Sequence, residues 1–509
     1  MRWRTIITPN ELTEMYPFFS KLHTKLHASA VSWILNKVSR YLERPIGIEL
    51  PADTKPFHAD PESLRALRLL EKLRDADFLR SFYFNKHTYG DEPRGYVAIA
   101  ELKNVDRFGF SGKGTDMFSQ SKTLWPTLGE AIERYAIMFF KPSSDDQCDA
   151  SFSSLSGRKA DIFSLAGFDE ILRKTPHSEY ELSYTNETIF RWTHAVNLHT
   201  ENTEWVPLQW FSFTHMRTHV HRTGRTEGAH PEPLLVPPIT TGIATGQNTT
   251  DATLRSLLEV IERDAFIIYW LNQIPPAKIN PATSNDPQIR ELARIAERYR
   301  LEFHVLYLRT DVPAHTVCTF LIDRSGIGPA LIVGAKTSLD ITDAVYSTMS
   351  DTLSQRGVFR KMMDARENRE RDLTNISQIG HKERMLFWFE VQKLTYLTQF
   401  LSGEFLEITS LPSYTSSSEP ENNLRELIRF FDKKNYPIYA KELLNEHLRE
   451  LTEGLSVIGV KIPQMQPLSL EESIPTLGGN RLYDVPEYLG FRRPRNRYDF
   501  FTSVPHPFP

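Results

Sequence analysis

The chain has 509 residues, 40% of them hydrophobic and 24% charged, with a formal net charge of −4. Such a length predicts about three folding units, or one large domain with additions, and the composition is typical of a globular protein with a sizeable core. The acidic balance excludes a general affinity for nucleic acid or anionic membrane, the two lone cysteines exclude a disulfide framework, and no apolar run reaches the roughly 18 residues of a spanning helix, so a cytoplasmic protein is expected.

The first 90 residues have the pattern of a mainly helical extension. Apolar residues recur at helical spacing over 22–43 and 61–82, on either side of a proline-bearing stretch at 45–57. We therefore expect residues 1–90 to form an N-terminal, mainly helical extension and residues 91–509 to form the main domain. The extension fits two interpretations equally, a docking region or a helical cap on the core.

From about residue 95 the chain alternates strand patterns with helical patterns. Helices are expected over 127–140 and 251–271. Strands are expected over 95–102, 190–198, 203–213, 301–308, 316–323 and 330–335. This interleaving predicts a mixed α/β (α+β) fold. The Ser-, Pro- and Glu-rich segment 409–423 is the best linker candidate.

The stretch GEAIERY, residues 129–135, is echoed by LEVIERD, residues 258–264. Each copy places two Glu three residues apart, with an Arg directly after the second, so that on a helix both carboxylates share a face. Taken alone, each copy is most simply an i,i+4 Glu–Arg pair worth a few tenths of a kcal/mol. The apolar neighbours of these Glu residues predict that both helices are well covered, and covered carboxylates need partners.

A glycine-rich segment precedes each copy, at 111–116 and at 240–251. We interpret both segments as turns that lead into a helix. Four carboxylates brought together need cations, and Mg²⁺ commonly bridges carboxylates to phosphates. Gly-rich backbone supplies N–H groups for phosphate oxygens, and Lys113, Arg134 and Arg263 add positive charge. Without any P-loop motif, the pattern predicts a nucleotide–Mg²⁺ site made of two related halves.

The C-terminal residues 504–509, VPHPFP, form a proline-rich arm. Such an end is either a frayed polyproline tail or a stiff arm that inserts into a cleft and presents the free carboxylate of Pro509.

Several of these stretches resemble the YcaO proteins, most closely the azoline-forming cyclodehydratases of thiazole/oxazole-modified microcin biosynthesis. The similarity extends from about residue 95 to residue 509. The matching stretches are GKG (112–114), LGEAIERY (128–135), TGIATGQNTTDATLRSLLEVIERDAF (241–266), GAKTSLDITDAV (334–345), VKIPQMQPL (460–468), NRLYDVPEYLG (480–490) and PHPFP (505–509).

The resemblance implies an ATP site made by the two Glu-x-x-Glu-Arg helices. The residues that would hold Mg²⁺ are Glu130, Glu133, Glu259 and Glu262. The expected nucleotide-binding residues are Lys113, Arg134, Gln247, Asp251, Arg263 and Arg356. Arg356 and Pro509 are the catalytic candidates, the latter through its carboxylate.

The chain departs from the family pattern beside this site. Pro126 stands where the family has Ser, so Thr127 or Ser121 would have to supply that hydroxyl. Gln247 and Asp251 replace the usual Asn and Glu, which changes the reach of each side chain by one methylene. The stretch that contains Arg356 also matches loosely, because Asp351 and Ser354 stand where Glu and Gln are usual.

The implied activity is ATP-dependent cyclodehydration of Cys, Ser or Thr in a ribosomally made precursor peptide. The resemblance also implies partners: a separate leader-binding subunit that resembles ubiquitin-activating enzymes, and a flavin-dependent azoline dehydrogenase, all within a synthetase complex. Two alternatives stay open. One is thioamide or amidine formation through the same phosphorylated amide, and the other is a non-catalytic scaffold that binds ATP or peptide.

Overall fold

The computed structural model describes most of the chain after residue 60. The described residues are 61–85, 89–103, 111–177, 180–213, 232–237, 239–365, 373, 375–376, 379–414, 417–452, 454–491 and 501–508. The helix expected over 22–43 and Pro509 lie outside them.

A three-stranded antiparallel sheet begins the described chain, in the order β1 (Leu79–Phe84), β2 (Tyr96–Leu102), β3 (Ser111–Asp116). Helix α4 (Pro61–Asp75) packs against α5 (Leu124–Phe139) beside this sheet.

The helix predicted over 61–82 is therefore wrong beyond residue 75. Asp77 has φ of +60°, a left-handed conformation that ends helices, and the aromatic-rich segment after it pairs with β2. The described part of the extension thus shares a sheet with the main domain, while the boundary at residue 90 stays a prediction.

Two larger sheets form the rest of the molecule. One has the order β4 (Gln147–Ser151), β5 (Ile189–Asn197), β13 (Tyr439–Glu442), β14 (Ser456–Lys461), β7 (Ile243–Gly246), with β6 (Thr203–Pro207) paired to β5. The other has the order β11 (Leu331–Ser338), β10 (His315–Ile322), β9 (Glu302–Tyr307), β8 (Ala277–Ile279), β12 (Phe405–Leu406).

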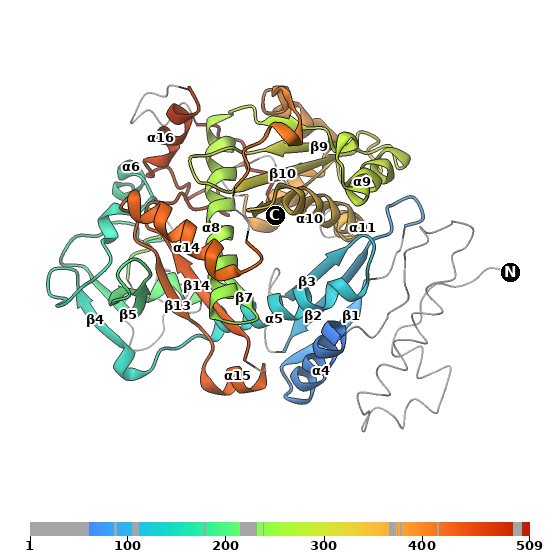
Figure 1. Ribbon diagram of the computed structural model, residues 1–509. Helices are drawn as coiled ribbons and strands as arrows, with labels where there is room; N and C mark the ends of the chain where they lie inside the picture. Colours follow the sequence, from blue (N-terminus) through green and yellow to red (C-terminus); the bar gives the residue numbers. More distant parts are fainter. Residues whose placement is uncertain are drawn as a thin grey trace.

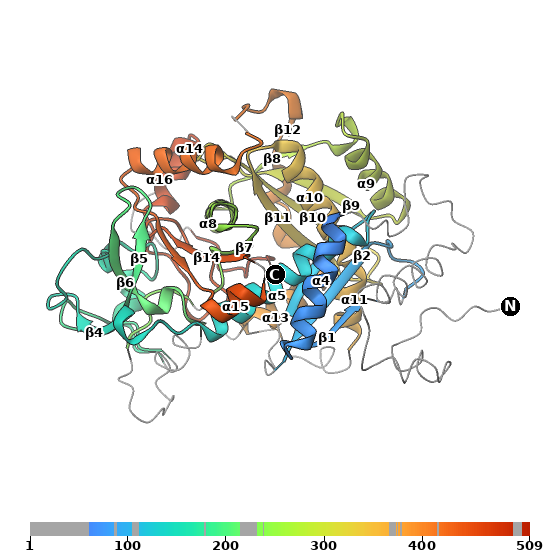
Figure 2. The ribbon, with the colours of Figure 1, turned by 60° about the horizontal axis from the view of Figure 1, so that its bottom comes forward.

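Helix α8 (Thr249–Asn272) runs through the centre of the molecule, and it packs on β7 and β14 on one side and on β11 on the other (Figure 1). Figure 2 shows α8 almost end-on between these two sheets. Phe266 and Trp270 on this helix are fully buried, and each such side chain contributes about 1.5–3 kcal/mol of hydrophobic stabilisation. No described helix is long and apolar enough to cross a membrane.

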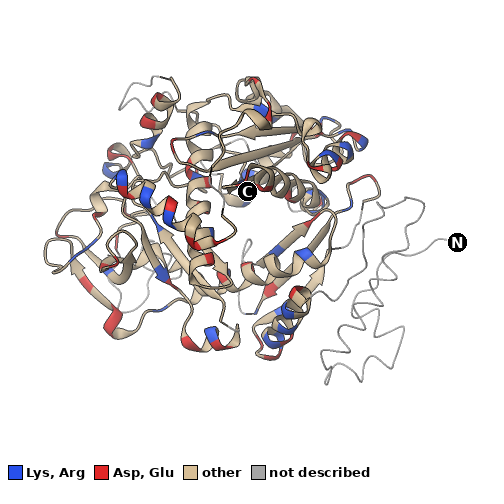
Figure 3. Ribbon diagram, viewed as in Figure 1, with Lys and Arg blue, Asp and Glu red and all other residues tan. Residues whose placement is uncertain are grey.

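The remaining described helices are α6 (Glu170–Lys174), α9 (Pro287–Arg298), α10 (Ile341–Ser354), α11 (Arg356–Asp364), α13 (His381–Trp388), α14 (Pro420–Lys433), α15 (Glu446–Leu451) and α16 (Arg481–Tyr488). Among them, α10 packs on β10 and β11, whereas α14 and α16 pack on α8. Lys and Arg alternate with Asp and Glu along α4, α9 and α14 (Figure 3), as in solvent-exposed helices stabilised by pairs of opposite charge.

The predicted mixed α/β fold is confirmed, together with most of its central elements. The confirmed elements are β2, α5, β5, α8, β9, β10 and β11. The strand expected over 203–213 ends at Pro207, where a 3₁₀ turn follows, and the linker expected over 409–423 is shortened because α14 begins at Pro420.

Candidate nucleotide and metal site

The first glycine-rich segment is a strand, so the turn predicted there is wrong: residues 111–116 form β3. The second segment does contain a turn, at Thr241 and Gly242, and it continues into β7 at residues 243–246. A Cβ added to Gly112 would lie 2.0 Å from the Thr127 carbonyl oxygen, and one added to Gly242 would lie 2.4 Å from that of Val460. These glycines therefore let neighbouring backbones approach closely.

In each half a backbone N–H binds the first Glu of the following helix, from within β3 in one half and from the turn before β7 in the other. The Lys113 nitrogen lies 2.8 Å from Glu130 Oε2, and the Gly242 nitrogen lies 3.1 Å from Glu259 Oε2. Both bonds join residues 17 positions apart. These N–H groups therefore bind carboxylates of the chain itself and not, as predicted, the oxygens of a phosphate. The equal spacing supports the prediction of two related halves.

The arginines repeat in the same way. Arg134 Nη2 lies 3.0 Å from Glu130 Oε1, and Arg263 Nη2 lies 3.2 Å from Glu259 Oε1. The ordinary i,i+4 pairs are thus present in both helices, and both are partly shielded from solvent. The helix pairs and the two-half site are therefore one arrangement rather than competing interpretations.

A buried hydroxyl ties each helix to the strand behind it. The Thr127 hydroxyl donates to the Thr123 carbonyl at 2.6 Å, and the Ser256 hydroxyl lies 2.8 Å from the carbonyl oxygens of both Ala252 and Ile458. Thr127 also lies 3.4 Å from the carbonyl oxygen of residue 98 on β2, so each hydroxyl contacts the strand beside its own half.

The second Glu of each pair differs between the halves. Glu133 is bonded to Arg134 Nη1 at 2.7 Å, whereas Glu262 accepts the Thr337 backbone N–H at 3.0 Å. Burial raises the pKa of both carboxyls, and the charge of Glu259 raises the pKa of each further. Glu133 lies on α5 and Glu259 on α8, so the two halves interact electrostatically.

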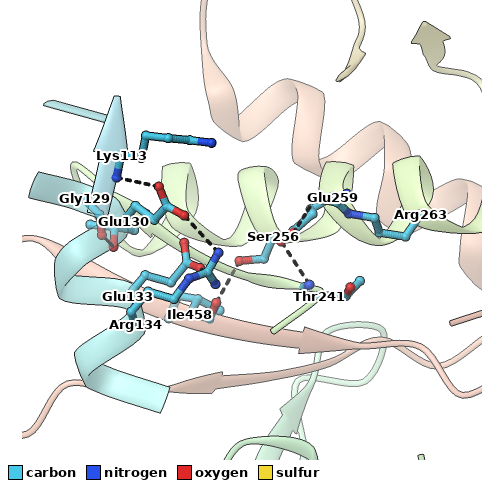
Figure 4. A network of polar contacts seen from close by, with 12 residues as sticks. Lys113, Gly129, Glu130, Glu133, Arg134, Thr241, Ser256, Glu259, Arg263 and Ile458 are labelled. Atoms are coloured by element: carbon cyan, nitrogen blue, oxygen red, sulfur yellow. Dashed lines mark hydrogen bonds and ion pairs between the residues drawn. The ribbon is translucent and has the colours of Figure 1, made fainter. Parts of the chain in front are cut away.

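Figure 4 shows that Glu130, Glu133 and Arg134 extend from α5 toward the α8 residues Glu259 and Arg263. The described residues contain no group of three or more side chains already arranged as metal ligands. Their chemistry fits Mg²⁺ all the same, because hard carboxylate oxygens are its preferred protein ligands, and four carboxylates are carried by the two facing helices. Assembly of the ligands would require Arg134 and Arg263 to release carboxylate oxygens.

The Lys113 ammonium is held by the end of α10. Its Nζ donates to the Gln355 side-chain oxygen, and two positions along β3 the Thr115 hydroxyl donates to Asp351. Lys113 is thus connected to the site through its N–H and to α10 through its side chain. Gln355 was missed by sequence reasoning, and only its position next to Arg356 would have drawn attention to it.

Gln247 and Asp251 lie at the start of α8. The Gln247 side-chain oxygen accepts from Arg65 of α4 at 2.8 Å, and its backbone N–H donates to Asp251 at 3.0 Å. Asp251 also accepts from Arg255. These contacts are exposed, so both side chains are accessible to a ligand, and their nucleotide role stays a prediction.

The Pro126 departure is accommodated without strain. Pro126 is exposed in the first turn of α5, where no intrahelical N–H bond is required. The Thr127 hydroxyl is buried in the bond described above, and the Ser121 hydroxyl lies 3.0 Å from that of Ser119. The Thr127 hydroxyl is therefore already used in a buried structural bond. Ser121 is the better candidate to supply the hydroxyl that the family's Ser would provide.

Arg356 is enclosed by the protein. It is 2% exposed, its Nε and Nη2 donate to Glu92 and Asp323, and its Nη1 lies 3.1 Å from the Pro329 carbonyl oxygen. Two carboxylates thus pair with this guanidinium inside the protein. The catalytic and nucleotide-binding roles of Arg356 stay predictions.

The C-terminal arm is buried, which favours the interpretation of an inserted arm over a frayed tail. Trp270 Nε1 donates to the Val504 carbonyl at 3.0 Å, and Trp388 Nε1 donates to the Pro505 carbonyl at 2.9 Å. Phe508 is 5% exposed.

The arm reaches the site itself. The Phe508 ring lies 4.1 Å from the Arg263 guanidinium carbon, a cation–π contact, and 5.0 Å from the Phe266 ring. Pro509, whose carboxylate was the predicted catalytic group, lies outside the described residues. The arm therefore contacts an arginine of the second Glu-x-x-Glu-Arg helix.

Lys461, at the end of β14, is a second cation that sequence reasoning missed. Its Nζ donates to the Thr241 carbonyl at 2.6 Å, beside the N–H that binds Glu259. Burial lowers the pKa of Lys461 to about 8, against the opposing charge of Glu259. The available signals were the place of Lys461 after a β-branched run and within the family-like stretch at residues 460–468.

The sequence of this chain matches one known protein family. A family model described as YcaO cyclodehydratase, ATP- and Mg²⁺-binding, matches residues 111–466. No curated protein sequence matches the chain.

Several solved structures have a similar fold. A heterocyclase in complex with substrate and cofactor has a TM-score of 0.66 and 16% identity, over 93% of this chain and 60% of that one. A YcaO protein from Methanopyrus kandleri bound with AMPPCP and Mg²⁺ has a TM-score of 0.54 and 18% identity, over 80% and 90% of the two chains. The E. coli microcin synthetase McbBCD complex with pro-MccB17 bound has a TM-score of 0.55 and 13% identity, over 84% of this chain and 96% of that one. This chain thus covers 60% of the length of that heterocyclase. At sequence identities of 13–18%, these similarities show a shared fold and nothing further.

Proposed function

This chain belongs to the YcaO cyclodehydratase family, described as ATP- and Mg²⁺-binding, and from that membership we propose that it converts Cys, Ser or Thr of a ribosomally made precursor peptide into thiazoline or oxazoline rings. The observation that supports the proposal best is the pair of matched halves. In each, a backbone N–H fixes the first Glu of a Glu-x-x-Glu-Arg helix, and the two helices interact through Glu133 and Glu259.

The proposed reaction activates an amide oxygen. The Cys, Ser or Thr side chain attacks the preceding carbonyl carbon and loses its proton, and the amide oxygen takes the γ-phosphoryl group of ATP. That oxygen then leaves as phosphate while the C=N bond of the ring forms. The peptide loses one water, and ADP and phosphate are released. The protein must position two substrates and neutralise charge.

The carboxylates and cations of the two halves suit that work. We propose that Glu130, Glu133, Glu259 and Glu262 hold Mg²⁺, which when bound supplies positive charge beside phosphate oxygens. Arg263, with Lys113 and Arg134, adds fixed positive charge, and Gln247 and Asp251 at the start of α8 contact the nucleotide. Phe508 holds the Arg263 guanidinium in place by packing against it.

The C-terminal arm supports a role in ring formation. Its backbone is anchored by two buried Trp side chains, so the arm reaches the site in a defined position. We propose that the Pro509 carboxylate, one residue beyond Phe508, takes part in proton transfer.

The proposed partners follow from a similar structure. One such structure is a three-component synthetase complex with its precursor bound. We propose that this chain also works in a synthetase complex, with a leader-binding subunit that resembles ubiquitin-activating enzymes and a flavin-dependent azoline dehydrogenase.

Mass spectrometry of the precursor peptide tests the proposal. The chain, its leader-binding partner, the peptide and Mg-ATP are combined, and we expect a loss of about 18 Da per ring, the mass of one water, with release of ADP and phosphate. A peptide whose mass does not change while ATP is consumed and the partner is bound would contradict ring formation. A mass gain of about 16 Da for exchange of oxygen by sulfur would instead indicate thioamide formation.

A non-catalytic scaffold is the second candidate, because the described residues hold no assembled group of metal ligands. Magnesium-dependent ATP turnover that rises on addition of precursor peptide separates the two. A scaffold would show no such turnover, whereas the enzyme would show it.

A further inference from the structure

A pocket lies beside α8 and the chain that leaves β14, and Val260 and most of residues 461–467 contribute to its lining. Its walls are mainly apolar and include Val236, Ile239, Val260 and Met465. Lys461 contributes the one ammonium group to the described lining. A pocket with apolar walls and few polar groups is the usual form of a small-ligand site.

Lys461 has unused hydrogen-bonding capacity. An ammonium has three N–H donors, and the structure shows one of them bonded to the Thr241 carbonyl. No Asp or Glu of the described residues lies within ion-pair distance of it. Burial lowers the pKa of Lys461, and the charge of Glu259 opposes that shift without forming an ion pair.

A second donor lines the same pocket. Trp210 is 3% exposed, and its Nε1 has no hydrogen-bond partner. A buried indole N–H without an acceptor costs about 1–3 kcal/mol, so native proteins rarely leave one unpaired. The described pocket lining thus offers two donors, Trp210 Nε1 and the Lys461 ammonium, beside one acceptor without a partner, Gln466 Oε1.

The pocket is connected to the proposed site by a short chain of bonds. Lys461 binds the carbonyl of Thr241, and the next residue, Gly242, donates its N–H to Glu259. Val260 forms part of the pocket wall and directly follows Glu259 on α8. Figure 4 shows Thr241 beside Glu259. A group in the pocket would therefore lie next to the proposed reaction centre.

We propose that this pocket binds a carboxylate carried on an apolar stem, and that in the proposed reaction the carboxylate belongs to the precursor peptide. Lys461 and Trp210 donate to its oxygens, while the stem packs on Val236, Ile239 and Met465. A phosphate group fits less well, because a single ammonium would have to balance about two negative charges against apolar walls. The assignment to a peptide rests on the proposed function, whereas the carboxylate chemistry rests on the pocket alone.

Binding of three small probes to the full chain tests the inference without turnover. N-acetylglutamate N-methylamide carries a side-chain carboxylate, N-acetylalanine carries a chain-end carboxylate, and N-acetylglutamine N-methylamide is the uncharged isostere of the first. Ligand-observed NMR titration should show at least one carboxylate probe binding about tenfold more tightly than the glutamine probe, which corresponds to ~1.4 kcal/mol. Whichever carboxylate binds identifies the source on the peptide.

Variants locate the effect in the pocket. Lys461→Met should reduce the carboxylate probe to the affinity of the glutamine probe, and Trp210→Phe, which removes only the N–H, should weaken it about threefold. Lys174→Met, at an exposed lysine paired with Glu170, is the matched control and should bind as the wild type does. Equal affinity of all three probes for the wild type, or unchanged affinity in Lys461→Met, would overturn the inference.

The outcome is separable from that of the proposed function. Probe binding without ring formation would leave the pocket assignment intact and remove the cyclodehydratase proposal. Ring formation without any carboxylate preference would do the reverse.

Discussion

The two halves of the proposed site share a framework and differ in how they hold the second Glu. In both, a backbone N–H binds the first Glu, and an Arg four residues later binds it again. In the second half Glu262 is also fixed by a backbone N–H, and Arg263 is covered by Phe508. In the first half, among the residues that the structure describes, Glu133 is hydrogen-bonded to Arg134 alone.

This difference suggests a division of labour. In the α8 half, the Glu262 carboxylate and the Arg263 guanidinium are already oriented by these contacts. The α5 half keeps a buried carboxylate whose pKa is raised well above its usual value and which lacks a backbone donor. We therefore expect Glu133 to be the ligand that moves most when Mg²⁺ and nucleotide bind.

The largest expected effect is the loss of ring formation in Glu133→Gln and in Glu262→Gln. Each change removes a charge needed for Mg²⁺, and we expect rates at least about 100-fold lower, in line with losses of ligands or of their partners at metal sites. Peptide mass spectrometry measures the rate, and thermal unfolding checks the fold. Glu170→Gln, at an exposed Glu, is the control and should keep full activity. If both site variants stay active, these carboxylates are not metal ligands.

The glycines come next, because they set the distance between strand and helix in each half. Gly112→Ala should destabilise the fold by about 1–3 kcal/mol through overpacking. Gly242→Ala should cost more, because its φ of +79° adds about 1–2 kcal/mol for a side chain. Chemical denaturation measures both.

Gly129 provides the matched control for those two substitutions. It lies inside α5, and a Cβ there would meet nothing closer than 3.6 Å, so Gly129→Ala should stabilise by up to about 1 kcal/mol. Equal behaviour of all three variants would show that the strands do not approach the helices as closely as described.

Phe508→Leu probes the cover on Arg263. Leu keeps most of the buried apolar volume but removes the ring face, and a cation–π contact is worth about 0.5–2 kcal/mol. We expect ring formation to slow by roughly tenfold with little change in unfolding temperature. Phe508→Met is a volume control that should behave in the same way as Leu. A rate of ring formation equal to that of the wild type would show that the contact between Phe508 and Arg263 is only structural.

The smallest expected effect is on stability against pH, measured with a chelator and without nucleotide. Because the pKa of Glu133 is raised in the folded state, the folded state binds its proton more tightly than the unfolded state does. The contribution of Glu133 to stability is therefore fully present below about pH 4.5, the usual pKa of Glu. That contribution is lost as the pH rises through the pKa of Glu133 in the folded state. Glu133→Gln should thus raise the unfolding temperature at pH 8 and leave it unchanged at pH 4.

Glu262→Gln sharpens the comparison in the same experiment. Its carboxylate is partly stabilised by the Thr337 N–H, so the gain at pH 8 should be smaller than that of Glu133→Gln. A larger gain in Glu262→Gln would reverse the assignment of the more and the less firmly oriented half.

The sequence was sufficient for features that follow from local pattern. The apolar spacing of α8 and the β-branched runs of β10 and β11 predicted those elements, and the repeated motif predicted two related halves. These signals succeed because periodicity records which face is buried.

Features that depend on tertiary contact could not be predicted. The glycines of residues 111–116 suggested a turn because glycine is usually a turn residue, yet here it allows α5 to approach β3. The burial of Arg356 depends on Glu92 and Asp323, which are far from it in sequence. Lys461 became a candidate only when folding placed it beside Thr241.

The central claim is that the two halves form one nucleotide–Mg²⁺ site, and calorimetric titration with AMPPCP and Mg²⁺ tests it most directly. We predict one nucleotide bound per chain in the wild type, an affinity at least about tenfold weaker in Glu133→Gln and in Glu262→Gln alone, and no further loss in the double variant, because neighbouring groups that act as a unit are not additive. Unchanged nucleotide affinity in either single variant, or losses that simply add in the double variant, would contradict a single site built from both halves.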